Sequence, residues 1–429
     1  MSLLGEIERG RTDAAAEDRG VLRFITAGSV DDGKSTLIGR LLHDTRAVFE
    51  DQLDALARAS RKRGQEVLDL SLLTDGLEAE REQGITIDVA YRHFSTRSRR
   101  YIIADTPGHE QYTRNMVTGA STADAAVILI DAGKGVLPQT RRHTAIAHLL
   151  GIRHLIVAVN KMDLVGYARA RFDAIRGDFL EFAAPLEIDE TLVIPISALR
   201  GDMVVDRGKG IGWYSGPTLL EALEGIDVNR EADALPMRFP VQFVLRPGAA
   251  SESRAYAGRV ESGVIMPGDE VIVLPSGRSS VVKEVLTFAG ARRVAAAGES
   301  VSLVLGDEID VSRGDLIAEC SRPPRAAKTI SAKLCWLAAE PLVPSARYAL
   351  RHTTRTVKAR FASLDYRIDI HTLAAQPSPG TLQMNDIARV TLSLQQPIFA
   401  DPYQANRATG SFIVIDEATN QTVAAGMIE

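Results

Sequence analysis

The chain has 429 residues, more than one hydrophobic core normally supports, so two or three domains are expected. Hydrophobic residues make up 45% and charged residues 24%, which excludes the disordered and fibrous classes, and a net charge of -5 gives only a weak case for nucleic-acid binding. Two cysteines are too few for a disulfide framework, and no signal-peptide core or membrane-spanning apolar run is seen, so a cytoplasmic protein is expected.

The first half of the chain alternates between apolar runs of strand length and helix-like stretches. Strands are predicted at residues 21–28, 101–106, 125–131, 154–160 and 191–197. Helices are predicted at 35–44 and 171–182, and the second has Phe172, Ile175, Phe179 and Phe182 at near-helical spacing. Such alternation predicts a mostly parallel sheet with helices on both faces.

The second half has a different sequence pattern, in which short β-branched runs are separated by turns. Turn sequences occur at residues 266–269, 275–278 and 312–315, a spacing that suits small antiparallel barrels. A Pro- and Arg-containing junction at 321–328 divides this half into two parts of about a hundred residues each. We therefore expect an α/β domain at 1–232, a β-barrel at 233–325 and a second β-barrel at 326–429.

A phosphate-binding loop is indicated between the first predicted strand and the helix that follows. Gly28 to Ser35 match the pattern G-x-x-x-x-G-K-[ST] in the strand-loop-helix context that the motif requires. Lys34 supplies a positive charge at the outer phosphates, and Ser35 offers a hydroxyl to Mg²⁺. The predicted nucleotide-binding residues here are Gly28, Ser29, Val30, Asp31, Asp32, Gly33, Lys34, Ser35 and Thr36.

Two carboxylates stand in the middle of this loop, where phosphates are expected. The backbone N–H groups and the helix N-terminus face the phosphates while most intervening side chains point away, so Asp31 and Asp32 need not oppose the nucleotide. We interpret Asp32 as a solvent-facing residue. For Asp31 two interpretations stay open: it helps to bind a monovalent cation that bridges the phosphates, or it only hydrogen-bonds the loop backbone.

Two further motifs follow later predicted strands, at the sheet edge where ligands of open α/β folds bind. The first is a D-x-x-G turn made of Asp105, Thr106, Pro107 and Gly108. Its Asp can hold the Mg²⁺ shell through water, and its Gly N–H can reach the terminal phosphate. The second is an N-K-x-D motif made of Asn160, Lys161, Met162 and Asp163.

The second motif identifies the base. The carboxylate of Asp163 can accept hydrogen bonds from N1–H and the amino group of guanine, whereas adenine presents a lone pair at N1, and paired contacts of this kind reject the wrong base by ~10⁴-fold. Asn160 is expected at the base edge and Lys161 along the sugar and ring. The backbone of Ser197, Ala198 and Leu199 is expected to close the pocket. The predicted ligand is GTP.

Two more residues concern turnover of the bound nucleotide. Thr86 lies in a Gly-containing loop between the two phosphate motifs, where its hydroxyl can join Mg²⁺ only when the third phosphate is present. His109 follows Gly108, and its imidazole is the best candidate to position the attacking water. The predicted catalytic residues are thus His109, Thr86 and Lys34, and the predicted Mg²⁺ residues are Ser35, Thr86 and, through water, Asp105.

These motifs together resemble the translational GTPase superfamily over essentially the whole chain. The fold that this implies is an α/β P-loop GTPase domain followed by two all-β antiparallel barrels. Within the superfamily the chain is most similar to the GTPase subunits of bacterial sulfate adenylyltransferase. That likeness is carried by GSVDDGKSTLIGRLLHDTR (28–46), DGLEAEREQGITIDVAYRHFST (75–96) and ADTPGHEQYTRNM (104–116). Elongation factors typically have His at the position of Asp32.

The resemblance implies a GTPase that drives formation of adenosine 5'-phosphosulfate and pyrophosphate from ATP and sulfate. No H-x-G-H or S-G-G-x-D-S pattern is present, so adenylyl transfer is expected on a partner, the small catalytic subunit of the enzyme (CysD-type), of about 300 residues. Some relatives carry a fused kinase, so this chain is expected to be an unfused or truncated form. The alternatives are an elongation factor-like GTPase that binds tRNA or the ribosome, and a regulatory switch without an enzymatic partner.

Overall fold

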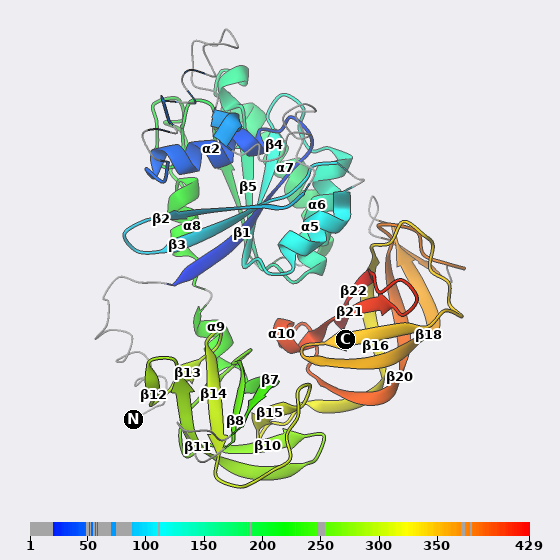
Figure 1. Ribbon diagram of the computed structural model, residues 1–429. Coiled ribbons are helices and arrows are strands. Elements are labelled where there is room, and N and C mark those ends of the chain that lie inside the picture. Colours follow the sequence, from blue (N-terminus) through cyan, green and yellow to red (C-terminus); the bar gives the residue numbers. More distant parts are fainter. Residues whose placement is uncertain are drawn as a thin grey trace. The chain divides into compact units, whose positions relative to one another are not determined.

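The computed structural model describes residues 20–48, 70–73, 88–109, 112–186, 190–227, 229–246, 254–369, 374–377 and 380–429, with residue 188 and a few positions between 51 and 58. The described residues form two compact units, and the chain passes from one to the other between Asp227 and Val228 (Figure 1).

The unit before this division is built on a six-stranded sheet in the order β2-β3-β1-β4-β5-β6 (Figure 1). The strands are β1 (Val21–Ala27), β2 (Ala90–Ser95), β3 (Arg100–Asp105), β4 (Ala125–Asp131), β5 (His154–Asn160) and β6 (Glu190–Pro195). All pairings are parallel except that of β2 with β3. The expected mostly parallel sheet is confirmed. Edge strand β2 was not predicted, because it mixes charged and aromatic residues and buries only Phe94 completely.

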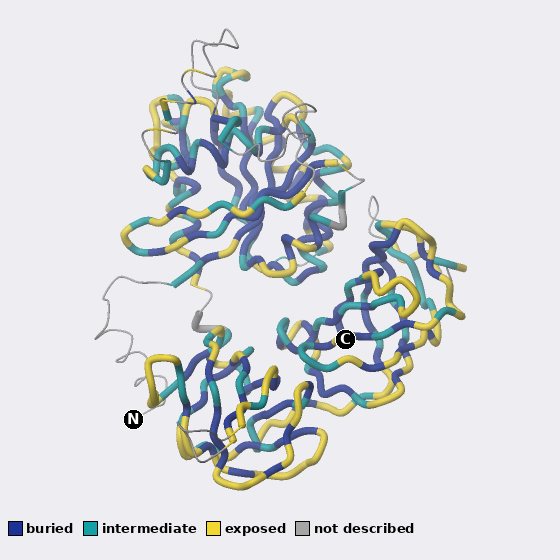
Figure 2. Tube along the Cα trace, viewed as in Figure 1, coloured by how far each residue is buried: buried dark blue, intermediate teal, exposed yellow. Residues whose placement is uncertain are grey.

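Helices alternate with these strands. They are α2 (Lys34–Asp44), α5 (Thr113–Ala120), α6 (Pro138–Leu149), α7 (Arg169–Ala183) and α8 (Leu219–Gly225), with 3-10 turns η1 (Leu70–Leu73), η3 (Met162–Val165) and η4 (Ala184–Leu186). The four residues predicted on the apolar face of α7, from Phe172 to Phe182, are all buried. Every residue of β4 is buried as well, and the centre of the sheet is dark in Figure 2. Burial on both faces explains why this strand reads as a continuous apolar run.

The second unit begins with a short helix, α9 (Asn229–Ala234), and a first barrel. Its strands are β7 (Arg238–Leu245), β8 (Ala255–Arg259), β9 (Val264–Ile265), β10 (Glu270–Leu274), β11 (Arg278–Thr287), β12 (Gly290–Arg292), β13 (Ala295–Ala296), β14 (Ser300–Leu305) and β15 (Leu316–Glu319). The sheet order β10-β15-β7-β8-β14-β11 closes through pairing of β10 with β11. Closure removes the free edges of the sheet and encloses an apolar core that includes Phe239, Tyr256 and Leu303.

A second barrel follows in the same unit. Its strands are β16 (Arg325–Trp336), β17 (Tyr348–His352), β18 (Arg355–Ile368), β19 (Ala375–Pro377), β20 (Ile387–Ala400), β21 (Ser411–Asp416) and β22 (Thr422–Ile428), with helix α10 (Arg407–Gly410). The order β17-β21-β22-β16-β20-β18 closes through pairing of β17 with β18. Trp336, Tyr348 and Phe361 pack edge-on at its core. The predicted pair of antiparallel barrels is therefore confirmed.

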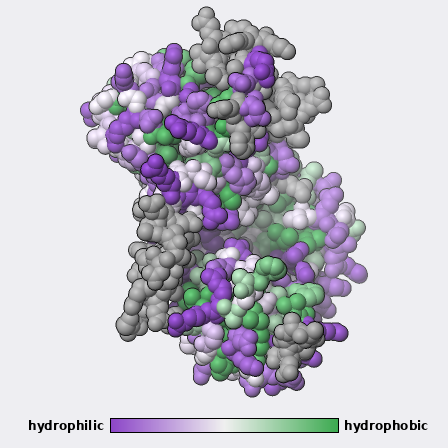
Figure 3. Space-filling view, turned by 60° about the vertical axis from the view of Figure 1, so that its left-hand side comes forward, coloured by the Kyte–Doolittle hydropathy of each residue, from purple (hydrophilic) through white to green (hydrophobic). Residues whose placement is uncertain are grey.

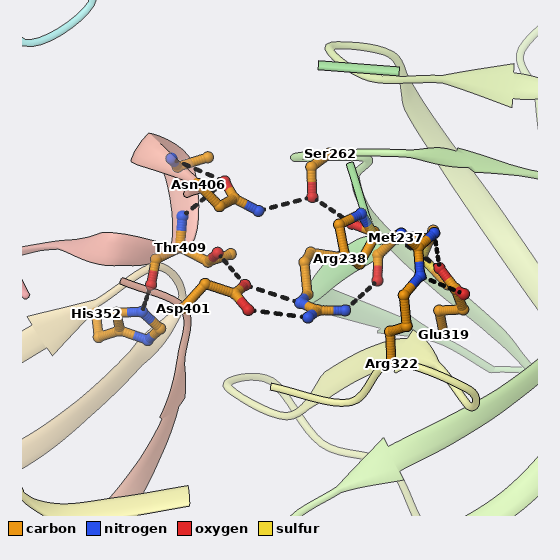
Figure 4. A network of polar contacts seen from close by, with 11 residues as sticks. Met237, Arg238, Ser262, Glu319, Arg322, His352, Asp401, Asn406 and Thr409 are labelled. Carbon is orange, nitrogen blue, oxygen red and sulfur yellow. Dashed lines mark hydrogen bonds and ion pairs between the residues drawn. The ribbon is translucent and has the colours of Figure 1, made fainter. Parts of the chain in front are cut away.

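The two barrels are joined by a buried ion pair (Figure 4). The guanidinium of Arg238, only 2% exposed, donates to both carboxylate oxygens of Asp401 at 2.9 Å each. Thr409 also donates to Asp401, and Asn406 donates across the junction to Ser262. Burial alone would raise the pKa of Asp401, but the bonds from Arg238 and Thr409 outweigh it and lower the pKa. Removing one partner of such a buried pair typically costs about 3–5 kcal/mol, so the pair fixes the barrels to each other.

On the face drawn in Figure 3, small groups of hydrophobic residues are interspersed with hydrophilic ones. Within the described part of the chain, no helix combines the length and apolar character needed to cross a membrane.

Candidate nucleotide-binding site

The phosphate-binding loop lies between the end of β1 and the start of α2, as predicted. The conformation depends on Gly33, the residue before the helix, whose φ of 95° lies in the left-handed region. A Cβ at this position would also lie 2.5 Å from the side-chain nitrogen of Asn160. Both observations require glycine, because any side chain here would separate the loop from the strand end that carries Asn160.

The side chain of Lys34 lies inside this loop. Its ammonium donates to the carbonyl oxygens of Gly28 and Ser29 at 2.9 Å each. Burial lowers the pKa of Lys34, while the carboxylates of Asp105 and Asp32 act in the opposite direction. The loop thus holds a desolvated cation, which attracts anions more strongly than a solvated one does.

The structure corrects the interpretation of Asp32 as solvent-facing. This residue is 1% exposed, and its Oδ2 accepts from the backbone N–H of Ser29 at 2.6 Å. Oδ1 has no hydrogen-bond partner among the described residues, and burial raises the pKa of the carboxyl. The prediction failed because the rule that loop side chains point outward ignores a side chain short enough to fold back onto its own turn.

Asp31 behaves as the general rule expects. Its side chain is exposed, and its backbone adopts a positive φ of 67°, which Asp tolerates better than most residues. Its carbonyl oxygen accepts from Lys161 at 2.6 Å. Adjacent carboxylates in the loop therefore have opposite environments, one inside the turn and one in solvent.

The D-x-x-G turn packs directly against the phosphate-binding loop. Asp105, at the end of β3, is 2% exposed and accepts from the hydroxyl of Thr26 at 3.4 Å. A Cβ at Gly108 would lie 2.6 Å from Nζ of Lys34 and 2.7 Å from the carbonyl oxygen of Gly28. This close approach requires glycine and brings the two phosphate motifs together.

The two residues predicted to act in turnover differ in how far the structure describes them. His109 follows Gly108, is exposed, and has its ring 6.4 Å from that of Tyr112 in an edge-on arrangement. Thr86 lies outside the described residues.

The N-K-x-D motif lies at the end of β5, beside the phosphate-binding loop. The side chain of Asn160 is buried; its nitrogen donates to the carbonyl oxygen of Asp32 at 2.8 Å, and its oxygen accepts from the N–H of Ala198 at 2.9 Å. Asn160 therefore ties the phosphate-binding loop to the loop after β6. We call residues 197–202 the base-closing loop.

Lys161 bridges two more elements. Besides its bond to Asp31, its ammonium pairs with Asp131 at the end of β4, with Nζ 2.9 Å from Oδ2. Burial alone would raise the pKa of Asp131, but the hydrogen bonds from Lys161 and from the N–H of Gly133 lower it. Asp131 was not among the predicted site residues, although it ends a predicted strand at the same sheet edge.

Asp163 and the base-closing loop meet through Ser197, whose hydroxyl donates to Oδ1 of Asp163 at 2.7 Å. Ser197 and Ala198 are buried, whereas Leu199 is 46% exposed. The structure thus brings together the predicted positions of the phosphate-binding loop, the D-x-x-G turn, the N-K-x-D motif and this loop.

Two supporting residues of the base-closing loop were missed. Arg40 of α2 donates to the carbonyl oxygens of Ala198 and Leu199. The hydroxyl of Tyr167 donates to Oδ2 of Asp202 at 2.6 Å, and burial together with this bond raises the pKa of Tyr167 to about 12. No motif contains either residue, because both act through contacts with distant parts of the chain.

The donors in this site fit Mg²⁺ shared with phosphates. Ser35, in the first turn of α2, offers a hydroxyl, and Asp105 offers a buried carboxylate at the adjoining strand end. Mg²⁺ prefers such oxygen ligands and usually keeps waters and phosphate oxygens in its shell. Across the described residues, no group of three or more His, Cys, Asp and Glu side chains could hold a metal ion by itself.

Fold and site together define a GTP-binding protein of the elongation factor Tu type. The family description "Elongation factor Tu GTP binding domain" matches residues 19–227, "Elongation factor Tu domain 2" matches 255–318, and "GTP-eEF1A C-terminal domain-like" matches 329–429. Of the solved structures, Sup35 complexed with GDP aligns with 97% of this chain and 95% of that chain at 23% identity, but the TM-score of 0.44 is too low to support an argument.

Two curated relatives identify the family. The bifunctional enzyme CysN/CysC of Mycobacterium tuberculosis is 52% identical over 411 residues, which are 95% of this chain and 67% of that protein. Sulfate adenylyltransferase subunit 1 of Cronobacter sakazakii is 52% identical over 417 residues, 96% of this chain and 87% of that protein. The chain belongs to the sulfate adenylyltransferase subunit 1 family, the GTPase subunits of that enzyme. This supports the sulfate-activating branch over the elongation factor alternative.

Proposed function

We propose that this chain works in a heteromeric sulfate adenylyltransferase, where it hydrolyses GTP to drive formation of adenosine 5'-phosphosulfate and pyrophosphate from ATP and sulfate. The single observation that carries the proposal is the meeting of four nucleotide motifs at one sheet edge, in a chain 52% identical to sulfate adenylyltransferase subunit 1. The partner that transfers the adenylyl group is the small catalytic subunit, and the complex works in the cytoplasm without contacting a membrane or nucleic acid.

The triphosphate binds at the phosphate-binding loop. Residues 28–36 form the binding loop. Apart from the N–H groups of Ser29 and Asp32, which bond within the turn, its backbone N–H groups and the N-terminus of α2 face the phosphates, and Lys34 adds a full charge. Its present contacts, two backbone carbonyls of the loop, leave a third ammonium proton to donate to a phosphate oxygen. Asp105 to His109 lie at the terminal phosphate, because Gly108 packs against Lys34.

The guanine base binds between the N-K-x-D motif and the base-closing loop. Both oxygens of Asp163 accept from the guanine edge, and Oδ1 has a second lone pair for the hydroxyl of Ser197. Ser197 thereby fixes the plane of the carboxylate. Residues 160–163 and 197–199 form the base pocket, with Lys161 held along the sugar by its pairing with Asp131.

Ser35, Thr86 and, through water, Asp105 would hold Mg²⁺, which would neutralise charge on the phosphate oxygens. The chain's own part in hydrolysis is orientation: His109, exposed at the end of the D-x-x-G turn, holds the attacking water, while Lys34 stabilises charge on the phosphates.

A monovalent cation binds near Asp31, whose exposed carboxylate lies at the outside of the phosphate-binding loop. The rate of GTP hydrolysis is compared in a potassium salt and in the salt of a large organic cation at equal ionic strength. Faster turnover in potassium, lost in Asp31→Asn, is expected. Equal rates in the two salts would remove this part of the proposal.

The function itself is tested by measuring GTP hydrolysis with and without the small subunit, ATP and sulfate. We expect slow hydrolysis by the chain alone and faster hydrolysis in the complex, because a switch is coupled only when the partner binds its two states with different affinity. Formation of adenosine 5'-phosphosulfate is measured in parallel. If it proceeds equally well with a non-hydrolysable GTP analogue, hydrolysis does not drive it and the proposal is wrong.

A further inference from the structure

One contact of the site spans its two ends and is explained by none of the motifs. Arg40 lies in α2, whose N-terminus belongs to the phosphate-binding loop. Its guanidinium leaves the helix to meet the base-closing loop, with Nε 3.0 Å from the carbonyl oxygen of Ala198 and Nη2 2.6 Å from that of Leu199. The third nitrogen, Nη1, is 3.4 Å from Oδ1 of Asp44 one turn further along the helix.

The side chains at the helix end of this contact are partly buried. The Arg40 side chain is 15% exposed and that of Asp44 is 19% exposed. Asp44 is itself held by His43, whose Nδ1 is 2.7 Å from the same carboxylate oxygen. An arginine whose guanidinium is restrained by a carboxylate of its own helix gives two directed hydrogen bonds to the loop at less entropic cost than a free side chain.

The two carbonyls that Arg40 binds belong to successive peptide planes. Because a trans peptide points its C=O and N–H in opposite directions, fixing the carbonyls of Ala198 and Leu199 also fixes the N–H groups of Leu199 and Arg200. The N–H of Arg200 donates to the hydroxyl of Ser197, the residue that bonds Asp163. The orientation of this loop therefore helps to set the plane of the Asp163 carboxylate.

We propose that Arg40 is a positioning residue for guanine recognition, which couples the phosphate helix α2 to the base-closing loop. This inference rests on the GTP site proposed above. The coupling makes the loop rigid only while α2 is in place, so phosphate binding at the helix N-terminus and base binding at the loop support each other. Arg40 takes no part in the chemistry, because it contacts neither the D-x-x-G turn nor Lys34.

The test compares Arg40→Met with Arg176→Met, which removes an exposed arginine of α7 in the same unit. A guanine nucleotide labelled on the ribose gives the dissociation rate, and steady-state assays give KM and kcat for GTP. Two lost hydrogen bonds predict a dissociation rate and a KM about tenfold higher in Arg40→Met, with kcat changed less than about twofold. Arg176→Met is expected to match the wild type.

A second variant, Arg40→Lys, keeps the positive charge and tests the need for both hydrogen bonds. Lys can donate to one of the two carbonyls but lacks the planar fork that reaches both, so Arg40→Lys is expected to raise the dissociation rate about threefold. The ratio of GTP to ITP affinity, which reports the contact of Asp163 with the guanine amino group, is expected to fall in Arg40→Met and to fall less in Arg40→Lys, because Ser197 then holds the carboxylate less firmly.

The outcomes separate this inference from the proposed function. If the wild-type protein fails to retain guanine nucleotides, the GTP site is wrong. If the wild type retains them and Arg40→Met releases them no more than about twofold faster, the positioning role is wrong. A fall in kcat with an unchanged dissociation rate, or an unchanged GTP to ITP ratio, would also overturn it. Should Arg40→Met fail to give a wild-type melting curve, Arg40→Lys decides by the same criteria.

Discussion

The phosphate end and the base end of the site are held together by different kinds of contact. Within the phosphate-binding loop the side-chain bonds are local: Asp32 accepts from Ser29, and Lys34 donates to the carbonyls of Gly28 and Ser29, so partners lie three to six residues apart. At the base end the partners are remote, 34 residues apart for Ser197 with Asp163 and 158 for Arg40 with Ala198. The phosphate-binding loop is a nine-residue segment that shapes itself largely by its own bonds, although Gly108 packs against it and Asn160 and Lys161 donate to it. The base end is held together through bonds between separate elements.

This difference has a consequence for how each end responds to substitution. A local turn keeps its shape by its own hydrogen bonds, so a change there removes one function and leaves the remainder intact. Distributed contacts act on a shared loop, so loss of any one loosens the same group of atoms. We therefore expect large, separate effects at the phosphate end and smaller, coupled effects at the base end.

The largest effect is expected from Lys34→Ala. The change removes a buried ammonium that has no local replacement, so affinity for GTP should fall by ~10³-fold, through loss of one charge-assisted hydrogen bond to phosphate and of the desolvated positive charge beside the phosphates. Equilibrium binding of a fluorescent GTP analogue measures it, with the exposed Lys209→Ala as the matched control. If Lys34→Ala and Lys209→Ala bind GTP with equal affinity, the loop does not bind phosphate through the Lys34 side chain.

The next largest effect is expected from Asp163→Asn, which tests the base end. An amide offers a donor where guanine needs an acceptor, so GTP affinity should fall by ~10²-fold while xanthosine triphosphate, with an oxygen at C2, binds better than in the wild type. Competition between the two nucleotides measures the preference. If the order of preference stays that of the wild type, Asp163 does not read the base.

The same difference between the two ends explains what the sequence could predict. The phosphate-binding loop was found because its residues are contiguous, and strands β4 and β5 were predicted with their bounds because each is an uninterrupted apolar run. Arg40 and Tyr167 could not be found, since nothing in the surrounding residues shows that they bond Ala198 and Asp202. The orientation of Asp32 was missed for a local reason, because a short carboxylate can turn either way and the motif does not decide which.

A smaller effect, again at the phosphate end, is expected from His109→Ala. The imidazole follows Gly108, is exposed and lies edge-on to Tyr112, so its removal should leave GTP affinity within about twofold of the wild type. The single-turnover rate of hydrolysis should fall about tenfold to a hundredfold, because only the orientation of water is lost. His93→Ala, an exposed histidine of β2, serves as the control. If His109→Ala hydrolyses GTP at the wild-type rate, another residue positions the attacking water.

The smallest effect is expected from Tyr167→Phe, which removes the hydroxyl that bonds Asp202 of the base-closing loop. Tyr214→Phe is the matched control, since its hydroxyl bonds the carbonyl of Val193 in β6 and not this loop. One lost hydrogen bond predicts nucleotide dissociation about threefold faster, with unchanged single-turnover hydrolysis.

Combined with Arg40→Met, the Tyr167→Phe change decides whether the base end is held by shared or by separate contacts. If both residues restrain one loop, a loop that has already lost Arg40 gains little further freedom when the Tyr167 hydroxyl is also removed. The dissociation rate of the double variant should then rise by less than the product of the two single increases. Rates that multiply would mean that Tyr167 and Arg40 hold independent parts of the pocket. The base end would then resemble the phosphate end, and the contrast between them would reduce to the distance in sequence over which each contact is made.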